Sequence, residues 1–260
     1  MLSYPSAISL SSRSLHELAA LLRAEHRALG GRWRRLSAGQ QALLALAHLR
    51  NGDTFARLAA GFGIGLATAW RYVQQARTVL AARAEDLTTA MERISRLAYV
   101  ILDGTLIPID RVHHQAPYYS GKHRRHGVNL QVITDPLGNL VWLSPALPGR
   151  THDLTAARTH AIIDALTRHQ VTGYADKAYQ GAGGTIATPR KPHKYRRNLT
   201  PEQKWVNHAH SAIRAHGERA NAMLKTWRIL TKLRCCPAKA TTITQAIAVL
   251  HHIEHPPPAL

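Results

Sequence analysis

The chain has 260 residues, 45% of them hydrophobic, which is enough to bury the core of one large domain or of two modest ones. Its 34 Lys and Arg residues outnumber its 15 Asp and Glu residues, and the resulting formal charge of +19 favours a polyanionic partner, most commonly nucleic acid. No apolar run approaches the roughly 20 residues that span a bilayer, and the N-terminus lacks a secretory signal pattern, so we expect a cytoplasmic protein with no membrane partner.

Residues 36–84 are predicted to be helical. A first helix with Ser37 as its N-cap is expected to end at Asn51-Gly52. Two further helices joined by a glycine-containing turn, the second beginning near Leu66, have the pattern of a helix-turn-helix. A structural or a dimerisation role is the alternative to DNA contact for this pair. The polar side chains on the second helix that suit DNA contact are Thr68, Arg71, Tyr72, Gln75 and Arg77.

From Ala98 onward the pattern changes from helical to extended. A buried strand is predicted to end at or near Asp103, and two β-rich runs around Asp135-Pro136-Leu137-Gly138-Asn139 predict a hairpin. The remaining predicted elements are a helix over 153–166, a short strand ending at Asp176, and a long helix from about 201 to 230 as the last large element. This order predicts a mixed α/β domain.

Three carboxylates occupy positions that favour a functional interpretation. Asp103 and Asp176 are expected at strand ends, and Glu218 lies on the long helix. An α/β sheet with a packed helix could bring all three together. Phosphoryl transfer with divalent metal ions uses such a trio, because Mg²⁺ prefers hard oxygen ligands.

Basic residues flank the third carboxylate on the long helix. At about 100° per residue, Arg214, Glu218 and Lys225 share one face of a continuous helix. A carboxylate there could hold a metal ion while the two cations bind phosphates. The alternative is an ordinary Arg–Glu pair, four residues apart, on a solvated face.

Further basic segments suit contact with DNA, although a solvated basic loop is a close alternative for the first of them. The loop 118–127 contains Lys122, Arg124 and Arg125, and the strip 189–197 contains Arg190 and Lys191. Lys177 and Tyr179 follow the second carboxylate closely and are expected to touch the scissile phosphate. Trp227 is expected in the core rather than as a base-stacking platform, because apolar residues accompany it on one helix face.

These motifs together resemble a known family. "LDGT" at 102–105, "YADKAYQG" at 174–181, and Arg214, three residues, Glu218, six residues, Lys225 resemble the signature of DDE transposases of bacterial insertion sequences. The most similar group is insertion-sequence family five, with its eukaryotic Harbinger relatives. The resemblance begins at the segment "LSAGQQALLALAHLRNGDTFARLAAGFG" and extends to "LKTWRIL", so it covers most of the chain.

The resemblance implies a fold and a reaction. The expected fold is an RNase H-like mixed sheet with flanking helices over 96–260, preceded by a small all-α helix-turn-helix domain over 1–95. Asp103 on the first strand, Asp176 at the end of the fourth and Glu218 on a following helix would together bind two Mg²⁺ or Mn²⁺ ions. A 3′ hydroxyl released by metal-activated water would then attack target DNA without a covalent protein intermediate. The implied partners are double-stranded DNA, as terminal inverted repeats and target, and further copies of the chain in a homodimer or higher oligomer.

Two alternatives stay open at this point. Asp153 in "GRTHDLTAA" is the other possible second carboxylate, but it suits the N-cap of a helix, whereas Asp176 ends a strand. The protein could instead be a catalytically silent, domesticated or decayed derivative that only binds DNA. A repair nuclease with an RNase H-like fold is less suitable, because it would have no obvious need of the helix-turn-helix.

Overall fold

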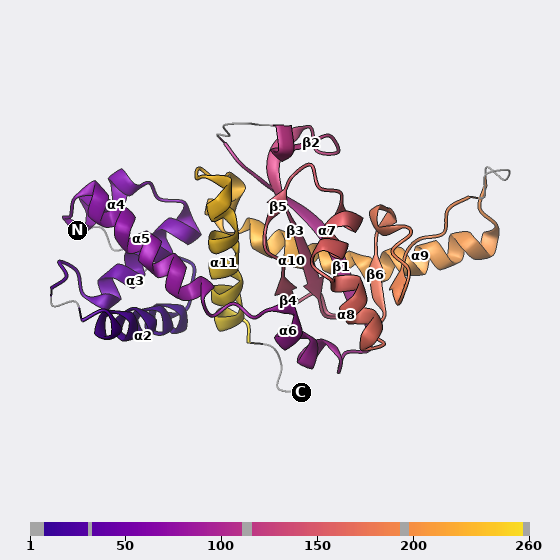
Figure 1. Ribbon diagram of the computed structural model, residues 1–260, viewed down its shortest axis with the longest axis horizontal. Helices are drawn as coiled ribbons and strands as arrows, with labels where there is room; N and C mark the ends of the chain where they lie inside the picture. The colour runs from indigo at the N-terminus through magenta and orange to yellow at the C-terminus, as the bar shows by residue number, and fades with distance from the viewer. Residues whose placement is uncertain (1–7, 31–32, 111–115, 193–197, 257–260) are drawn as a thin grey trace. The chain divides into compact units, whose positions relative to one another are not determined.

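The computed structural model describes residues 8–30, 33–110, 116–192 and 198–256, which form two compact units (Figure 1). The helical unit consists of Met1–Ala84 together with Lys225–Pro256, and the sheet unit consists of Glu85–Leu224. This division differs from the expected one at residue 95. The helix Leu87–Ile94 lies in the sheet unit because Met91 and Ile94 are buried in that core, and the C-terminal segment returns to the helical unit.

The helical unit contains the expected helix-turn-helix. Its helices are α2 (Ser12–Ala28), α3 (Ala38–Leu46), the π-helix η1 (Ala47–Asn51), α4 (Phe55–Phe62), α5 (Leu66–Ala81), the short 3-10 helices η4 (Arg228–Thr231) and η5 (Pro237–Lys239), and α11 (Ala240–Glu254). The predicted N-cap is confirmed, since Ser37 and Gln40 form a reciprocal capping box at the start of α3. Gly63, in the left-handed conformation with φ 62°, ends α4 and permits the tight turn into α5.

Helix α11 contradicts the expectation that the last large element ends near residue 230. Its sequence is rich in Thr and Ile, which have modest helix propensity, so the local pattern is weak. Burial outweighs this propensity, because α11 packs against α5 and α2 and fully buries Ile247 and Leu250. Trp227, just before η4, is 2% exposed, which confirms its predicted place in the core.

The sheet unit is built on a mixed sheet, as expected for an RNase H-like fold. Its strands are β1 (Val100–Pro108), β2 (Tyr119–Ser120), β3 (Arg125–Thr134), β4 (Leu140–Leu143), β5 (Leu147–Pro148), β6 (Gly173–Ala175) and β7 (Ile186–Ala187). The order is β2-β3-β1-β6-β7, with β4 and β5 also pairing with β3. β1 runs antiparallel to β3 and parallel to β6, and the predicted hairpin is confirmed as β3–β4.

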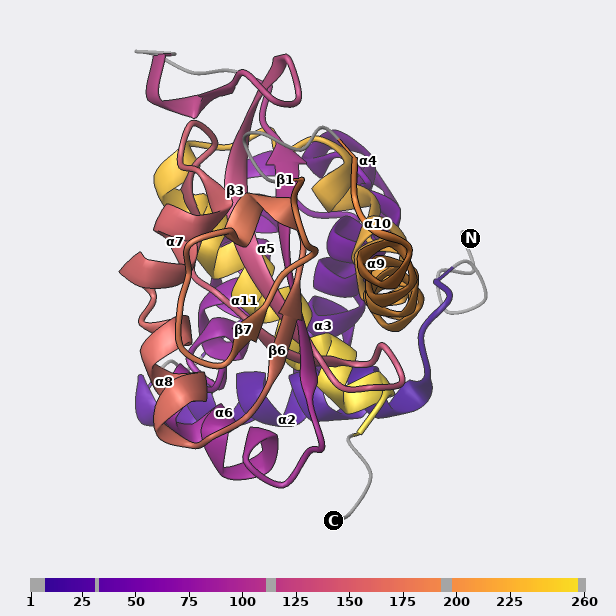
Figure 2. The same ribbon diagram turned by 90° about the vertical axis from the view of Figure 1, so that its right-hand side faces the viewer.

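Helices cover both faces of this sheet (Figure 2). The helices are α6 (Leu87–Ile94), α7 (Asp153–Thr159), α8 (Ile162–Arg168), α9 (Pro201–Ala215) and α10 (Gly217–Lys225), with a short 3-10 helix η3 (Lys177–Tyr179). α7 and α8 lie on one side and α9 and α10 on the other. Each of the two long predicted helices is therefore two helices, broken at the left-handed Ala161 and after Ala215.

Side chains alternate along β1, so successive residues of this strand point to opposite faces of the sheet. Val100 and Leu102 point into the core beneath α6, α7 and α8. Ile101 points to the opposite face, where α10 approaches so closely that a Cβ at Gly217 would lie 2.8 Å from Ile101 Cγ2. Asp103 shares the face of Ile101 and therefore faces the α9–α10 side.

The strand β1 is longer than expected. β1 continues past Asp103 to Pro108, because Gly104 and Thr105 stay in register with β3. The expectation that Asp103 ends a strand is therefore wrong, and the residue lies in the middle of one.

Of the helices that the structure describes, none combines the length and the apolar character needed to cross a membrane.

Candidate active site

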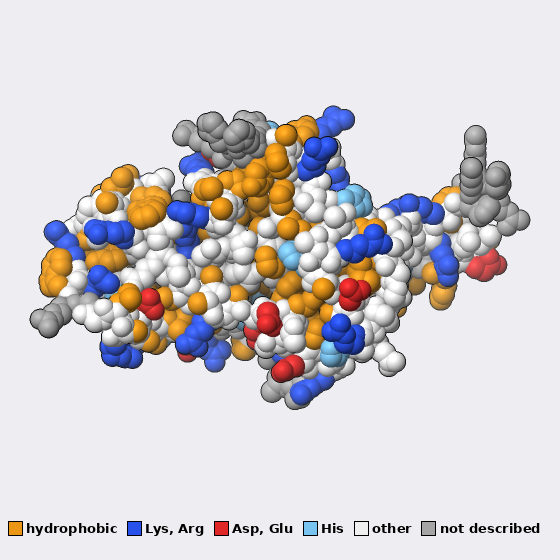
Figure 3. All heavy atoms as spheres, viewed as in Figure 1, with side chains coloured by type: hydrophobic (Ala, Val, Ile, Leu, Met, Phe, Trp, Pro, Cys, Tyr) orange, Lys and Arg blue, Asp and Glu red, His pale blue; other side chains and the backbone are white. Residues whose placement is uncertain are grey.

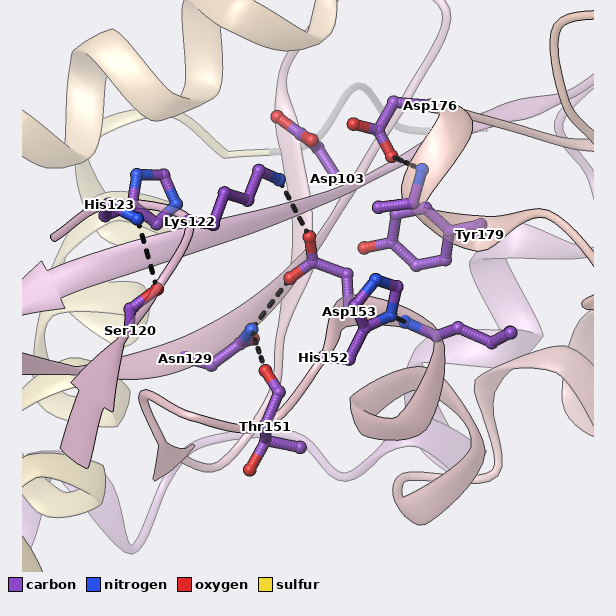
Figure 4. Close-up of polar contacts among 12 residues, drawn as sticks. Asp103, Ser120, Lys122, His123, Asn129, Thr151, His152, Asp153, Asp176 and Tyr179 are labelled. Carbon is purple, nitrogen blue, oxygen red and sulfur yellow. Dashed lines mark hydrogen bonds and ion pairs between the residues drawn. The ribbon is translucent and has the colours of Figure 1, made fainter. Parts of the chain in front are cut away.

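Asp103 and Asp176 lie side by side on adjacent strands. β1 and β6 are parallel, with Leu102 opposite Ala175. Asp103 follows Leu102 on β1, and Asp176 follows Ala175 directly after the end of β6. Residues in register on neighbouring strands project from the same face, and such strands lie about 4.8 Å apart. Figure 4 shows the two side chains next to one another, with the Asp176 carboxylate pointing to the side on which Asp103 lies. The backbone N–H of Ala178 donates a 2.8 Å hydrogen bond to Asp176 Oδ1 and holds that side chain in place.

One residue of α9 and one residue of α10 lie close to the Asp103 carboxylate. Asn221 Nδ2 on α10 donates a 2.7 Å hydrogen bond to Asp103 Oδ2, and Arg214 Nη2 on α9 lies 4.0 Å from Asp103 Oδ1. Burial raises the pKa of the Asp103 carboxyl, and the nearby Asp176 and Asp153 add to this, while Arg214 opposes it. Burial therefore disfavours the charged form of the Asp103 carboxyl, and a bound cation would stabilise that form.

Asp153 is a third carboxylate of the same cluster. It belongs to the first turn of α7 and sits directly against Gly104, where a Cβ would overlap its carboxylate. Asp153 Oδ1 accepts a 2.7 Å hydrogen bond from Asn129 Nδ2, and Oδ2 accepts a 3.1 Å bond from Lys122 Nζ. The expected N-cap role of Asp153 is wrong, because His152 caps α7 through Nδ1 and leaves the Asp153 side chain turned into the cluster.

A buried polar chain supports Asp153 from beneath. Tyr179 donates a 2.6 Å hydrogen bond to Gln131 Oε1, and Gln131 Nε2 donates a 2.9 Å bond to Asn129 Oδ1. Burial, and then the carboxylates of Asp153, Asp103 and Asp176, raises the pKa of the Tyr179 hydroxyl well above its usual value, so Tyr179 stays a neutral donor. The expectation that Tyr179 touches phosphate is wrong, because its side chain is fully buried.

Sequence reasoning missed Asn129 and Gln131. Both lie among apolar neighbours in the buried part of β3 and are almost fully buried themselves. Two amides at alternate positions of a buried strand were the available signal, because a buried amide requires hydrogen-bond partners. Gln131 lies opposite Gly104 on β1, so the amide pair faces the same side as Asp153.

Lys122 brings a positive charge to this cluster. Burial lowers the pKa of its ammonium, but the carboxylates of Asp153, Asp176 and Asp103 raise it by more, so the net shift is upward. A cavity of about 130 Å³ lies beside the Lys122–Asp153 pair, and its lining includes His123, Arg150 and His152. The cluster thus already attracts one cation.

The donors present fit a hard divalent ion. Asp103 and Asp176 offer carboxylate oxygens, which are the ligands that Mg²⁺ and Mn²⁺ prefer. In the described ranges, no three His, Cys, Asp or Glu side chains already converge as a metal-binding group. Glu218 is exposed in the first turn of α10, and Asn221, nearly one turn further on, is the α10 residue that reaches Asp103.

The expected common face of Arg214, Glu218 and Lys225 depended on one continuous helix and is wrong in that form. The break after Ala215 interrupts the helical phase between the arginine and the glutamate. Arg214 faces Asp103, and Lys225 ends α10 and belongs to the helical unit.

The other predicted DNA contacts lie in both units. In the sheet unit the predicted contacts are all exposed: Lys122, Arg124, Arg125, Lys177, Arg190 and Lys191. Lys177 directly follows Asp176, and Arg190 is tied through its backbone to Asn207. Lys and Arg side chains are spread over the face shown in Figure 3, where acidic side chains occupy few positions. Residues 193–197 of the basic strip lie outside the described residues.

In the helical unit, one face of α5 lines a groove. Thr68, Arg71 and Gln75 line this groove of about 610 Å³ together with Trp33 and Arg34. Arg71 is exposed and donates a 3.3 Å hydrogen bond to Thr68. Tyr72 also borders the groove but is 7% exposed, so most of its ring is part of the core.

Comparisons with known proteins match the N-terminal and the C-terminal parts of the chain to the same superfamily. Residues 102–252 match the family model described as DDE superfamily endonuclease, and residues 34–86 match the helix-turn-helix of DDE superfamily endonuclease. The chain is 30% identical over 253 residues to a protein of Streptomyces albus G named as a candidate transposase for the insertion sequence element IS112. That alignment covers 94% of this chain and 91% of the relative. No solved structure gives a significant match.

Proposed function

The chain belongs to the DDE superfamily of endonucleases, and from that membership we propose that it is the DNA transposase of a bacterial insertion sequence. It cuts at the terminal repeats of the element and joins the 3′ ends to target DNA. The observation that carries the proposal is the pairing of Asp103 and Asp176 on adjacent parallel strands, in a chain with a net charge of +19. A concentrated acidic site in a basic protein suits local chemistry on a polyanion.

Asp103, Asp176 and Glu218 would hold two Mg²⁺ or Mn²⁺ ions. Divalent ions held there would supply Lewis-acid stabilisation of the negative charge that develops during phosphoryl transfer. The side chains of the protein supply orientation. Asn221 fixes one oxygen of Asp103, and the Ala178 amide fixes one oxygen of Asp176, which leaves the other oxygen of Asp176 available as a ligand.

Cations around the acids would bind the DNA backbone. Arg214 and Lys177 border the two aspartates and can neutralise phosphates next to the scissile one. The helix-turn-helix would bind double-stranded DNA at the terminal repeats through Arg71, Thr68 and Gln75. Joining two element ends requires at least two active sites, so a homodimer or a higher oligomer on DNA belongs to the proposal.

The decisive experiment is cleavage of a DNA fragment that carries the flanking terminal repeats, with Mg²⁺, Mn²⁺ or EDTA. We expect metal-dependent cuts at the repeat ends that Asp103→Asn and Glu218→Gln each reduce by about 100-fold or more. DNA binding by Glu218→Gln should stay within a few-fold of wild type. The matched control is Glu202→Gln, which makes the same change at an exposed glutamate in the first turn of α9 and should cut normally.

Two other outcomes of this experiment would change the assignment. Loss of binding together with cleavage in Glu218→Gln would make Glu218 a structural residue. Tight binding by the wild type with no cut under any metal would favour the alternative, a catalytically silent derivative that acts as a DNA-binding protein.

The same assay tests whether Asp176 or Asp153 is the second metal-binding carboxylate. Both oxygens of Asp153 are engaged by Lys122 and Asn129, so we expect Asp153 to support the site and Asp176 to hold metal. Asp176→Asn should abolish cleavage, whereas Asp153→Asn should reduce it by about tenfold. Activity that survives only in Asp176→Asn would assign the metal to Asp153.

A further inference from the structure

The helical unit contains a second groove, on the side of α5 that carries Trp70, Gln74 and Arg77. This cavity of about 810 Å³ is closed on its other side by the segment that follows α10, through Arg228 and Lys239 among others. We call it the cationic groove, because its described lining includes the cations Arg77, Arg228, Lys232, Arg234 and Lys239. Asp53 is the one acid among the described lining residues, and it already pairs with Arg57 at 3.5 Å.

Arg77 is the most informative residue of this groove. The residue is 4% exposed, and its Nε has no hydrogen-bond partner within the described parts of the chain, although its Nη2 donates to Gln74. Burying a guanidinium without an acidic partner costs free energy, because the lost hydration is not replaced. Burial accordingly lowers the pKa of Arg77, and the Cys235 thiol offsets this only in part. Such a group at a cavity wall is poised for an anion.

The rim of the groove also suits a nucleic acid. Trp70 is 42% exposed, and Lys239 Nζ lies 5.3 Å from its ring centre, so an aromatic surface and a cation stand together. Arg228 and Lys239 are exposed, and together with Arg77 they bring three positive charges to this groove, more than a single small anion would neutralise. A nucleic-acid backbone, which carries several phosphates, would neutralise these charges.

We propose that the cationic groove binds the phosphate backbone of duplex DNA. The segment 228–239 is then part of the DNA-binding surface of the helical unit, in addition to the α5 face that carries Arg71. This inference rests on the proposed function, because it takes DNA as the partner. It adds a second binding surface on a different side of α5 and gives the C-terminal segment a role in binding.

The test is the salt dependence of duplex DNA binding by the full chain. Arg228→Gln combined with Lys239→Gln removes two exposed charges from the groove. The slope of log K against log salt is negative, and each phosphate that is no longer neutralised should reduce its magnitude by about 0.9. We expect the magnitude of the slope to fall by about 1.8 in this double variant. The matched control, Arg13→Gln combined with Arg23→Gln on α2, removes the same charge at exposed positions outside the groove and should keep the wild-type slope.

A variant of the buried arginine distinguishes a binding role from a structural one. Arg77→Met replaces the guanidinium with an apolar chain of similar length. We expect weaker DNA binding together with an unchanged or higher midpoint of thermal unfolding, because an unsatisfied buried charge has been removed. A lower midpoint with unchanged DNA affinity would mean that Arg77 serves the fold, and it would overturn the proposal.

The remaining outcomes separate this inference from the proposed function. If the wild type binds DNA and Arg71→Gln weakens that binding, but the groove and control double variants have equal slopes, the cationic groove is not a DNA site while the transposase proposal stands. If the wild type binds no DNA at any salt concentration, both proposals fail.

Discussion

At the scale of single residues, Gly104 decides where a carboxylate can sit. The Asp153 carboxylate occupies the space that a side chain at position 104 would fill. From there it accepts hydrogen bonds from Asn129 and Lys122. Burial raises the pKa of Asp103, and Asp153 adds a smaller contribution in the same direction. The glycine of the "LDGT" motif is therefore required for its missing side chain, since β1 keeps an ordinary extended conformation at this point.

The first prediction concerns this close approach. Gly104→Ala should displace the Asp153 carboxylate, lower the free energy of unfolding by about 1–3 kcal/mol and reduce cleavage. Gly121→Ala is the control, because a Cβ there meets nothing within 4 Å. Urea denaturation and the cleavage assay measure the two effects. Equal stability and activity in the two variants would show that Asp153 can move without consequence.

At the scale of elements, the C-terminal helix α11 contacts the start of α2 within the helical unit. The N-cap residue of α2, Ser11, makes no capping hydrogen bond with its own side chain. The Glu254 carboxylate on α11 instead accepts hydrogen bonds from Ser11 N at 3.0 Å and from Ser14 Oγ at 2.6 Å. Burial raises the pKa of Glu254, but these hydrogen bonds lower it by more, so the net shift is downward. An anion at the N-terminus of α2 also matches the helix dipole.

The pH dependence of unfolding follows from the same helix. His251 is 4% exposed, and burial, with repulsion from His252 and His255, lowers its pKa to about 4, although Glu254 opposes the shift. The folded protein keeps this imidazole neutral, whereas the unfolded chain protonates it below about pH 6.5. Stability contributed by His251 is therefore present above pH 6.5 and is lost as the pH falls toward 4, by up to about 1.4 kcal/mol per unit.

The control for this effect is an exposed histidine of the same unit. His251→Gln should give a flatter dependence of the unfolding free energy on pH between 6.5 and 4.5 than wild type. His16→Gln, on the exposed side of α2, should keep the wild-type slope. An equally steep loss of stability in His251→Gln would contradict a neutral buried imidazole.

At the scale of the whole molecule, the chain forms one unit, then a second, and then returns to complete the first. The segment from Lys225 completes the helical unit, and Ile243, Ile247 and Leu250 of α11 are buried there. Burial of three such side chains contributes roughly 5 kcal/mol or more. That amount is comparable to the entire stability of a small domain.

The corresponding prediction is that the helix-turn-helix does not fold stably without the C-terminal helix. A fragment of residues 8–84 should show no cooperative thermal transition by circular dichroism. A permuted fragment, in which residues 225–256 precede 8–84 through a short Gly/Ser linker, should regain one, because Glu254 already contacts Ser11. A cooperative transition at the same temperature in both fragments would show that α11 is dispensable.

The sequence by itself determined the features that depend on local chemistry. Ser37, Gly63 and the run beginning at Leu66 specify the helix-turn-helix, because caps and left-handed glycines act within one turn of chain. The turn at Asp135–Asn139 specifies the hairpin in the same way, with Asp135 accepting hydrogen bonds from the Leu137 and Asn139 amides. The motifs around Asp103 and Asp176 were sufficient to indicate the family that the comparisons confirm.

Only the tertiary structure decided how distant segments combine. The parallel register of β1 and β6 places Asp103 beside Asp176, and nothing within either strand specifies that pairing. The hydrogen bonds of Asp153 with Asn129 and Lys122, the approach of Asn221 to Asp103, and the return of α11 to α5 likewise join residues far apart in the chain. The physical reason is that burial and hydrogen-bond pairing are properties of the assembled core, whereas propensity and capping act along the chain.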